Sequence, residues 1–396
     1  MASKDEPVLI VGGGIGGMAA ALALCQAGHH VELLEQAPEI GEIGAGIQLG
    51  PNAFAAMDAL GVGVQARSRA VYTDFMVMRD AIDGAEVATI PVGEAFRERF
   101  NNPYAVIHRA DLHLSLYEGV LASENIRVHT DTRIERVELR DDAATVIDQN
   151  GKAISGDALI GADGIKSVVR QLLIGDSHRV SGHVVYRAVV KRDEMPADLR
   201  WNAAAIWVGP NCHLVHYPLR GGEQYNIVVT FHSREVEEWG VREGSREEVM
   251  SYFTEIADKP RELLEKADSW KRWATADRDP VDQWGRGRAT LLGDAAHPML
   301  QYLAQGACMA IEDAVTLGCA LRATGGDIEA GFRLYESKRI VRTARVVLSS
   351  REMGRIYHAK GIERQVRNSL WKGRTPERFY DAMEWLYGWT AAECLS

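Results

Sequence analysis

The sequence predicts an α/β protein in which a Rossmann-like βαβ domain is interleaved with an antiparallel-sheet domain and followed by C-terminal helices. Three observations predict this class. A β-branched run at residues 8–11 leads directly into a cluster of glycines. Strand-like segments dominate residues 181–233, and helical patterns dominate from about Ala307 to the end. A chain of 396 residues is long enough for two such domains.

The start of the chain has the pattern of one βαβ unit. Val8-Leu9-Ile10-Val11 has the composition of a strand buried on both faces. Residues 18–26 are rich in Ala and Leu and favour a helix, which Gly28 would end. Residues 30–35 predict a second strand. A unit of about 30 residues has the size of the dinucleotide-binding motif.

An uncharged stretch at residues 8–25 follows Lys4 and superficially resembles a signal peptide or a membrane span. The glycines within Gly12–Gly17 would weaken a continuous helix at each position. A strand, a tight turn and a helix explain the stretch better. No other segment has the length and apolarity of a span, so we expect none.

Further along the chain, Pro51 starts a short helix that Gly61 closes, and residues 112–122 predict another helix. Asn150-Gly151 between β-type runs is a hairpin signal. Two apolar runs predict buried strands, at residues 158–161 and 289–293. Four alternating segments predict the antiparallel sheet, at residues 184–190, 204–208, 213–217 and 225–231.

These patterns divide the chain into a discontinuous nucleotide-binding domain, a substrate-binding β-sheet domain and a C-terminal helical region. We expect the first domain to comprise residues 1–73, 100–180 and 278–350. The second comprises residues 74–99 and 181–277. The third comprises residues 351–396.

Composition excludes several classes of protein. The net charge of −10 argues against a nucleic-acid partner, because such proteins present a basic face. The five cysteines are scattered and form no CxxC pair, which argues against a disulfide framework and a structural zinc site. We therefore expect no metal. A reducing cytoplasm fits this cysteine usage best.

The glycine cluster satisfies the dinucleotide fingerprint G-x-G-x-x-G through Gly12, Gly14 and Gly17. The first glycine allows the tight turn, the second lets the backbone approach a pyrophosphate, and the third lets helix and strand pack closely. Glu35 follows Gly14 by 21 residues, where a carboxylate accepts ribose hydroxyls. An ordinary glycine loop is the alternative, and the pattern leaves NAD and FAD both open.

Two further segments bear on the cofactor. Ala162-Asp163-Gly164 and Leu292-Gly293-Asp294 each follow an expected strand, and His108-Arg109-Ala110-Asp111-Leu112 lies between them and the glycine turn. In order and spacing these segments resemble the group A flavoprotein aromatic hydroxylases over essentially the whole chain. The resemblance implies FAD as cofactor, and NADH, or alternatively NADPH, as a donor that docks transiently.

In that family the Asp-Gly segment lies near FAD and the nicotinamide nucleotide, and the Gly-Asp segment contacts the ribityl chain. Gly306 would open a helix whose N-terminus favours the negative charge of a reduced flavin. Two roles are equally consistent with His297, one in function and one as a turn residue, and the sequence favours neither. We expect these cofactor-binding residues: Gly12, Gly14, Ile15, Gly16, Gly17, Glu35, Gln36, Ile47, Gln48, Arg109, Asp163, Asp294, Gly306 and Ala307.

The informative catalytic stretch is residues 209–222. On a strand, His213 and Tyr217 share one face. From this pattern alone, a histidine hydrogen-bonded inside the sheet is the more common explanation. Together with Gln301, however, the stretch resembles the 3-hydroxybenzoate 6-hydroxylases.

That resemblance implies that His213 deprotonates a phenol, Gln301 contacts its hydroxyl and Tyr217 lines the pocket. The implied reaction uses O2 and a flavin C4a-hydroperoxide to hydroxylate 3-hydroxybenzoate para to its hydroxyl, which gives 2,5-dihydroxybenzoate (gentisate). The partner of the substrate carboxylate stays open among Arg187, Arg220 and His216. Tyr186 and Tyr302 are either pocket walls or core aromatics.

Alternatives remain at this point. A salicylate- or 6-hydroxynicotinate-type decarboxylating monooxygenase is the nearest, although relatives of that kind tend to carry proline where Gln301 stands. A flavin disulfide reductase would need a cysteine pair within residues 36–60, and there is none. A non-catalytic dinucleotide-binding protein is the alternative from another class.

The C-terminal region is rich in aromatic residues. These either mark a homodimer interface or cover the same chain. They are Trp371, Phe379, Tyr380, Trp385, Tyr387 and Trp389.

Overall fold

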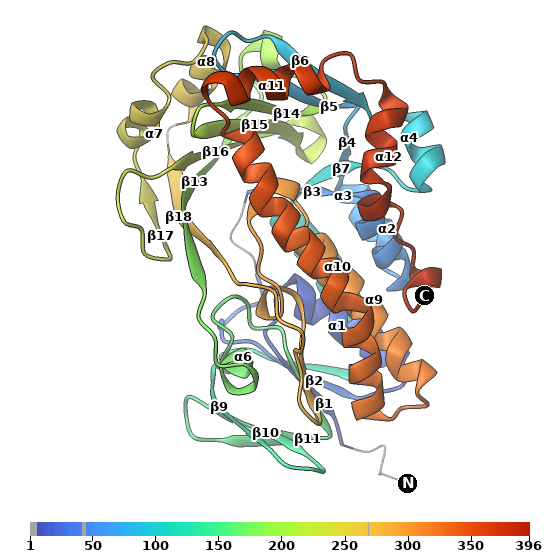
Figure 1. Cartoon of the computed structure of the whole chain (residues 1–396). Coiled ribbons are helices and arrows are strands. Elements are labelled where there is room, and N and C mark those ends of the chain that lie inside the picture. The colour runs from blue at the N-terminus through green and yellow to red at the C-terminus, as the bar shows by residue number, and fades with distance from the viewer. Residues whose placement is uncertain (1–5, 42–44, 268) are drawn as a thin grey trace.

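The computed structural model of the protein describes residues 6–41, 45–267 and 269–396 (Figure 1). Figure 1 shows a smaller sheet in the lower half, a larger sheet in the upper half, and the long helix α10 (Ile328–Tyr357) running beside both. This is the predicted α/β class, with a βαβ unit, an antiparallel sheet and C-terminal helices.

The lower half contains a five-stranded parallel sheet in the described residues, in the order β19-β12-β1-β2-β8. The helices α1 and α9 pack against each other beside it, because their small and apolar side chains share one core. Its elements are β1 (Val8–Val11), α1 (Ile15–Gln26), β2 (Val31–Leu34), β8 (Ile126–His129), β12 (Ala158–Gly161), β19 (Ala289–Leu291) and α9 (Gly306–Ala323).

The upper half contains an eight-stranded sheet in the order β17-β18-β13-β16-β15-β14-β5-β6. Its neighbours pair antiparallel as predicted, except that β14 and β5 run parallel. Two distant chain segments therefore join in one sheet. Its strands are β5 (Phe75–Asp80), β6 (Glu86–Pro91), β13 (Arg179–Lys191), β14 (Ala203–Gly209), β15 (Cys212–Leu219), β16 (Gln224–His232), β17 (Gly240–Gly244) and β18 (Trp270–Asp277).

Two three-stranded sheets complete the described β structure. In the first, Gly151 adopts a left-handed φ of +79° in the turn between β10 and β11, which confirms the predicted hairpin. The second lies where the two halves meet, because β7 contacts β15. Their strands are β9 (Ile134–Leu139), β10 (Ala144–Asp148) and β11 (Ala153–Gly156), then β3 (Gly46–Leu49), β4 (Val71–Tyr72) and β7 (Ala105–His108).

The remaining helices cover the two halves. They are α2 (Pro51–Ala59), α3 (Gly63–Arg69), α4 (Glu94–Phe100), α5 (Arg109–Leu121), α6 (Val168–Leu173), α7 (Arg246–Tyr252), α8 (Asp258–Lys266), α11 (Gly361–Trp371) and α12 (Pro376–Tyr387). Short 3-10 turns are η1 (Ala197–Leu199), η2 (Arg220–Gly222), η3 (Gly293–Ala295), η4 (Gln301–Leu303) and η5 (Ala391–Glu393). None of these helices, in the part of the chain described, could cross a membrane by its length and apolarity.

Element boundaries differ from the predictions by a few residues. The first helix starts at Ile15 rather than Met18, because the turn is complete at Gly14 and the helix includes two glycines. The aromatic residues of α12 pack on the same chain. Tyr380 and Tyr387 lie 5.4 and 6.0 Å from the Phe96 ring, centroid to centroid, and both are buried.

Candidate active site

The glycine turn holds β1, α1 and β12 in close contact. Gly12 has a φ of +107°, and a Cβ there would lie 2.4 Å from the carbonyl oxygen of Ala162. A Cβ on Gly17 would lie 1.8 Å from the carbonyl oxygen of Gly12. Larger residues at these positions would separate the strand from the helix. The turn therefore presents bare backbone at the start of α1, where a helix dipole favours a phosphate.

Glu35 lies immediately after β2 and beside this turn. Its carboxylate accepts hydrogen bonds from the backbone N–H of Gly13, at 2.6 Å, and of Ala37, at 2.7 Å. Each carboxylate oxygen has a further lone pair for a donor such as a ribose hydroxyl. The structure thus places Glu35 where the sequence predicted it.

One cavity of about 1040 Å³ extends from the glycine turn to the upper sheet. All but one of the predicted site residues line it. Gly17 does not line the cavity, and its role is the close packing of α1. The lining residues from our prediction are Gly12, Gly14, Ile15, Gly16, Glu35, Gln36, Ile47, Gln48, Arg109, Asp163, His213, Tyr217, Asp294, Gln301, Gly306 and Ala307.

The end of the cavity away from the glycine turn is one face of the upper sheet. His213, Val215 and Tyr217 of β15 line the cavity, whereas Leu214 is buried in the core on the opposite face. This confirms the predicted alternation. Tyr217 also packs closely on β3, because a Cβ on Gly46 would lie 2.4 Å from the Tyr217 ring.

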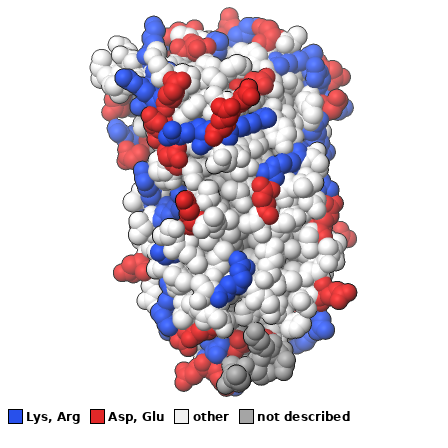
Figure 2. Space-filling view, turned by 90° about the vertical axis from the view of Figure 1, so that its right-hand side faces the viewer, with Lys and Arg blue, Asp and Glu red and all other residues white. Residues whose placement is uncertain are grey.

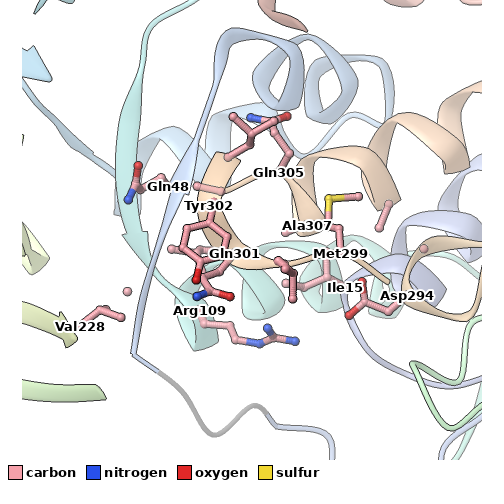
Figure 3. A pocket seen from close by; sticks show the side chains of 18 of the residues that line it. Ile15, Gln48, Arg109, Val228, Asp294, Met299, Gln301, Tyr302, Gln305 and Ala307 are labelled. Carbon is pink, nitrogen blue, oxygen red and sulfur yellow. The ribbon is translucent and has the colours of Figure 1, made fainter. Parts of the chain in front are cut away.

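The turn that carries Gln301 lies between the two ends of the cavity. Figure 3 shows Gln301 and Tyr302 between Asp294 on one side and Val228 of the sheet on the other. The amide Nε2 of Gln301 donates to Thr230 Oγ1 at 3.4 Å. Thr230 pairs with His213 across β16 and β15. Gln301 is therefore placed over the strand position of His213, and both residues line the same part of the cavity.

His213 is buried and has a defined partner. Its Nδ1 lies 2.8 Å from Nε2 of His358, the residue that follows α10. Burial, and secondarily the nearby His183, lowers the pKa of His213 to about 3. The imidazole is thus neutral at pH 7, which leaves one ring nitrogen able to accept a proton.

His297, which the sequence left open, has a structural role. Its Nε2 lies 2.5 Å from Asp313 Oδ2, which also accepts from the backbone N–H of Gly293 at 3.1 Å. Asp313 and Glu312 each accept a 2.6 Å hydrogen bond from Arg339. Burial alone would raise the pKa of Asp313, but His297 and Arg339 outweigh it and lower that pKa to about 2. This buried network fixes the Gly293 turn to α9.

Asp163 provides a test of whether the cavity suits a nucleotide cofactor. Its Oδ2 accepts hydrogen bonds from the backbone N–H groups of Val168 at 2.8 Å and Val169 at 3.4 Å, which caps α6. Its Oδ1 is buried without a hydrogen-bond partner among the described residues. A buried acceptor of this kind needs a donor. A hydroxyl-rich or amide-bearing ligand in the cavity would supply one, so the residues fit FAD.

The three candidates for the substrate carboxylate differ in placement. His216 is buried on the far face of the sheet against Trp201. Arg220 pairs with Asp111, with nitrogen–oxygen distances of 3.3 Å, away from the cavity lining. Arg187 lines the cavity and makes no ion pair with any residue that the structure describes. Of the aromatics left open, Tyr302 lines the cavity and Tyr186 lies in the core beside Glu248.

Part of the cavity wall was not predicted from the sequence. Its apolar end is formed by strands and helices whose sequences carry no motif, and it includes several of the C-terminal aromatics. The continuous apolar run Phe75–Met78 in β5 is a sequence signal for a buried strand there. The wall residues that were not predicted are Met76, Val77, Met78, Ala88, Ile90, Ser349, Met353, Tyr357, Trp371, Phe379, Met383, Trp385 and Tyr387.

This site has the features of a dinucleotide-binding protein: the glycine turn, the acceptor after β2 and the long cavity. A family model identifies the dinucleotide as FAD. A model described as "FAD binding domain" matches residues 5–350, and the chain belongs to this family. FAD is therefore its cofactor, as predicted.

Relatives support the same class. The chain is 67% identical over 392 residues to a 3-hydroxybenzoate 6-hydroxylase of Polaromonas naphthalenivorans, covering 99% of this chain and 98% of that protein. It is 62% identical to a protein of the same name from Klebsiella oxytoca, with 99% of each covered. A solved structure of Klebsiella pneumoniae HpxO with FAD and uric acid matches with a TM-score of 0.84 at 27% identity, covering 98% of each chain. These findings confirm the resemblance to the flavoprotein aromatic hydroxylases.

Asp294→Ala is expected to weaken FAD retention. Asp294 is exposed on the cavity wall beside the start of α9. Loss of one hydrogen bond to a charged group corresponds to about 1.5–3 kcal/mol, or about 10- to 100-fold in the dissociation constant. Titration of the apoprotein with FAD measures this. Asp142→Ala, in the exposed turn before β10, is the control, and equal FAD affinity of the two variants would refute the role.

His216→Leu is expected to flatten the acid side of the stability profile. Burial lowers the pKa of His216 to about 3, below the ordinary value of 6.5. Between these two values the unfolded chain binds a proton that the folded chain does not, so stability falls as pH decreases. Each such group contributes about 1.4 kcal/mol per pH unit. Urea unfolding at pH 7 and pH 5 measures the proton uptake that accompanies unfolding. This uptake should be lower by one proton in the variant than in the wild type. An unchanged slope would contradict this.

Proposed function

We propose that this protein is a 3-hydroxybenzoate 6-hydroxylase that converts 3-hydroxybenzoate to 2,5-dihydroxybenzoate with FAD, O2 and NADH. The observation that carries the proposal is the placement of a neutral histidine, His213, and an arginine without an ion pair among the described residues, Arg187, on one wall of the same cavity. A substrate with a phenolic hydroxyl and a carboxylate complements this pair.

The register of the sheet sets the spacing between these two groups. Arg187 pairs with Val228, and Val228 pairs with Val215, so the three share one row across the sheet. His213 lies two residues from Val215 on the same face. Two strand spacings and two residues of rise separate the Cα atoms of Arg187 and His213 by roughly 12 Å. Both side chains can therefore reach a single benzoate ring between them.

The remaining residues position the ring. Gln301 would hold the hydroxyl beside His213, and Tyr217 would cover the ring from the β3 side. Removal of the hydroxyl proton raises the electron density at the para carbon, which is carbon 6 of 3-hydroxybenzoate. When bound, reduced FAD with O2 supplies the electrophilic oxygen atom, and the glycine turn, Glu35 and Asp294 would hold that cofactor.

The direct test is product analysis. The FAD-loaded protein is mixed with NADH, O2 and 3-hydroxybenzoate, and the products are separated by chromatography. Gentisate is the expected product, and its absence would overturn the substrate assignment. Salicylate and 6-hydroxynicotinate serve as comparison substrates. Release of carbon dioxide from either one at a higher kcat/KM would favour a decarboxylating monooxygenase. NADPH in place of NADH tests the donor.

Arg187→Met is expected to raise the KM for 3-hydroxybenzoate by about 10- to 100-fold with a smaller effect on kcat. Removal of a charge-assisted hydrogen bond corresponds to about 1.5–3 kcal/mol. Steady-state kinetics measure the change. Arg220→Met, which disrupts an exposed ion pair, is the matched control. Equal KM values for the two variants would place the carboxylate elsewhere. 3-Hydroxybenzamide, which lacks the charge, should lose little affinity with Arg187→Met.

We further propose the domain limits given by the sequence, because the strands of the eight-stranded sheet fall almost entirely within residues 74–99 and 181–277.

We also propose that the protein is a cytoplasmic homodimer. The five cysteines are free, which suits a reducing compartment. Figure 2 shows a face whose middle carries few charged side chains, as dimer interfaces often do. Light scattering of the purified protein tests this, and a monomer at micromolar concentration would refute it.

A further inference from the structure

Four histidines form a series beside the substrate end of the cavity. They come from β15, the end of α10, β13 and β16: His213, His358, His183 and His232. Successive ring centroids lie 5.1, 5.2 and 5.1 Å apart. Side-chain exposure increases along the series, because the first two are buried, His183 is half-buried and His232 is exposed. The series therefore leads from the cavity wall to the surface.

The hydrogen bond between His213 and His358, the two buried histidines, couples the tautomer of one ring to that of the other. The 2.8 Å contact between His213 Nδ1 and His358 Nε2 holds one proton. If His213 accepts a substrate proton at Nε2, its own Nδ1 proton must be the one donated to His358. A proton that enters at one ring nitrogen can then leave through the other. A histidine with this geometry transmits a proton rather than storing it.

Backbone hydrogen bonds connect two of these histidines, His358 and His232, through Asn211. The N–H of Asn211 donates to the carbonyl oxygen of His358 at 3.1 Å, and the N–H of His232 donates to that of Asn211 at 3.0 Å. Asn211 has a φ of +57°, as the tight turn between β14 and β15 requires. Tyr302 Oη lies 2.6 Å from His183 Nδ1 and orients that ring. Centroid separations of about 5 Å between His358, His183 and His232 place these rings in direct edge-to-face contact.

We propose that His358, His183 and His232 form a proton relay that carries the hydroxyl proton of the substrate from His213 to solvent. The proposal rests on the proposed function, since it requires a phenolic substrate. The O–H bond of the phenol breaks and an N–H bond forms at His213 Nε2, while the Nδ1 proton passes to His358 and an equivalent proton leaves His232 for water. The phenol becomes a phenolate and no electrons are exchanged. Reverse transfer to the product restores both tautomers.

The environment favours transfer over storage. The groups that face the four rings from neighbouring elements are Tyr302, Tyr357 and Arg179. Among the described residues, no carboxylate forms a hydrogen bond with any of the four rings. No negative charge in contact with the rings would therefore stabilise an imidazolium. Burial lowers the pKa of His183 to about 4 and that of His358 well below its usual range. Because these two pKa values lie below 7, neither His183 nor His358 keeps an added proton at neutral pH, and the proton passes on toward solvent.

A metal site is the other chemistry that clustered histidines suggest. In the described ranges of the chain, no group of three or more His, Cys, Asp and Glu side chains is placed to hold a metal ion. The four rings contact one another edge to face or at a tilt, and their nitrogens do not converge on one point as metal ligands would.

The test uses His358→Gln in the FAD-loaded protein. Glutamine accepts the His213 hydrogen bond but cannot pass a proton on. Stopped-flow mixing with 3-hydroxybenzoate in weakly buffered solution with a pH indicator measures proton release. We expect release at least tenfold slower than in the wild type, with a larger solvent deuterium isotope effect and unchanged FAD content and substrate affinity. An unchanged release rate would overturn the relay, as would a loss confined to substrate affinity.

Three further variants extend the test. His213→Ala combined with His358→Gln should be no slower than His213→Ala alone, because the two residues act in one path, and additive losses would overturn the proposal. His232 is exposed, so His232→Gln should fold like the wild type. This variant should raise the solvent isotope effect. An isotope effect unchanged in His232→Gln would remove that residue and the outer step from the relay. His216→Gln, a buried histidine on the far face of β15, is the matched control.

Failure of the relay and failure of the proposed function give different results. If the wild-type protein forms no gentisate, the substrate assignment fails. If the wild type forms gentisate and His358→Gln releases protons at the same rate, only the relay fails.

Discussion

Replacing His213 by Ala is expected to lower gentisate formation at pH 7 by about 10²- to 10⁴-fold, the usual contribution of a positioned base. FAD should remain bound, because His213 lies on the sheet face of the cavity and the glycine turn lies at the other end. Activity should recover partly toward pH 10, where the phenol ionises without help. Product chromatography across a pH series gives the profile.

The control for this prediction is His216→Ala, which removes an equally buried ring from the same strand but from the face away from the cavity. It should change stability without changing the pH profile. Wild-type turnover of His213→Ala at neutral pH would refute the base assignment. A loss that stays constant from pH 7 to pH 10 would indicate a positional role for the ring instead.

Arg339→Met is expected to destabilise the fold by about 3–5 kcal/mol, the range found when one partner of a buried ion pair is removed. Arg339 is 1% exposed, and its removal leaves the fully buried carboxylates of Glu312 and Asp313 facing each other with less compensation. Because Asp313 also holds Gly293, the variant should lose FAD more readily. Chemical unfolding and flavin content measure the two effects.

Arg333→Met provides the comparison on the same helix. Arg333 pairs with Glu329 at 3.6 Å on the surface, where ion pairs contribute little. Its replacement should change the unfolding free energy by no more than about 0.5 kcal/mol. Similar losses for the two variants would show that burial does not govern the contribution of the network.

Local chemistry made much of the site predictable. The glycine turn and Glu35 belong to one short segment, so their geometry follows from the strand, turn and helix that the segment forms. The alternation that places His213 and Tyr217 on one face follows from the period of a strand. In each case the residues that determine the position are close in sequence.

The rest depends on contacts between distant segments. His358 meets His213 across 145 residues, and no pattern around His358 signals this. Arg187 differs from Arg220 because Arg220 forms an ion pair with Asp111, which lies 109 residues away in the sequence. The parallel pairing of β14 with β5 brings Met76 and Met78 to the cavity wall, and neither strand's sequence specifies its partner.

The contact between Gly46 and the Tyr217 ring links two positions in their evolutionary history. While an aromatic ring stands at 217, any side chain at 46 would displace it, so a change at 46 is admissible only after 217 has become smaller. The two positions should therefore vary together among related chains, and the order of their changes should be fixed. A side chain at position 46 would therefore indicate that position 217 no longer carries an aromatic ring.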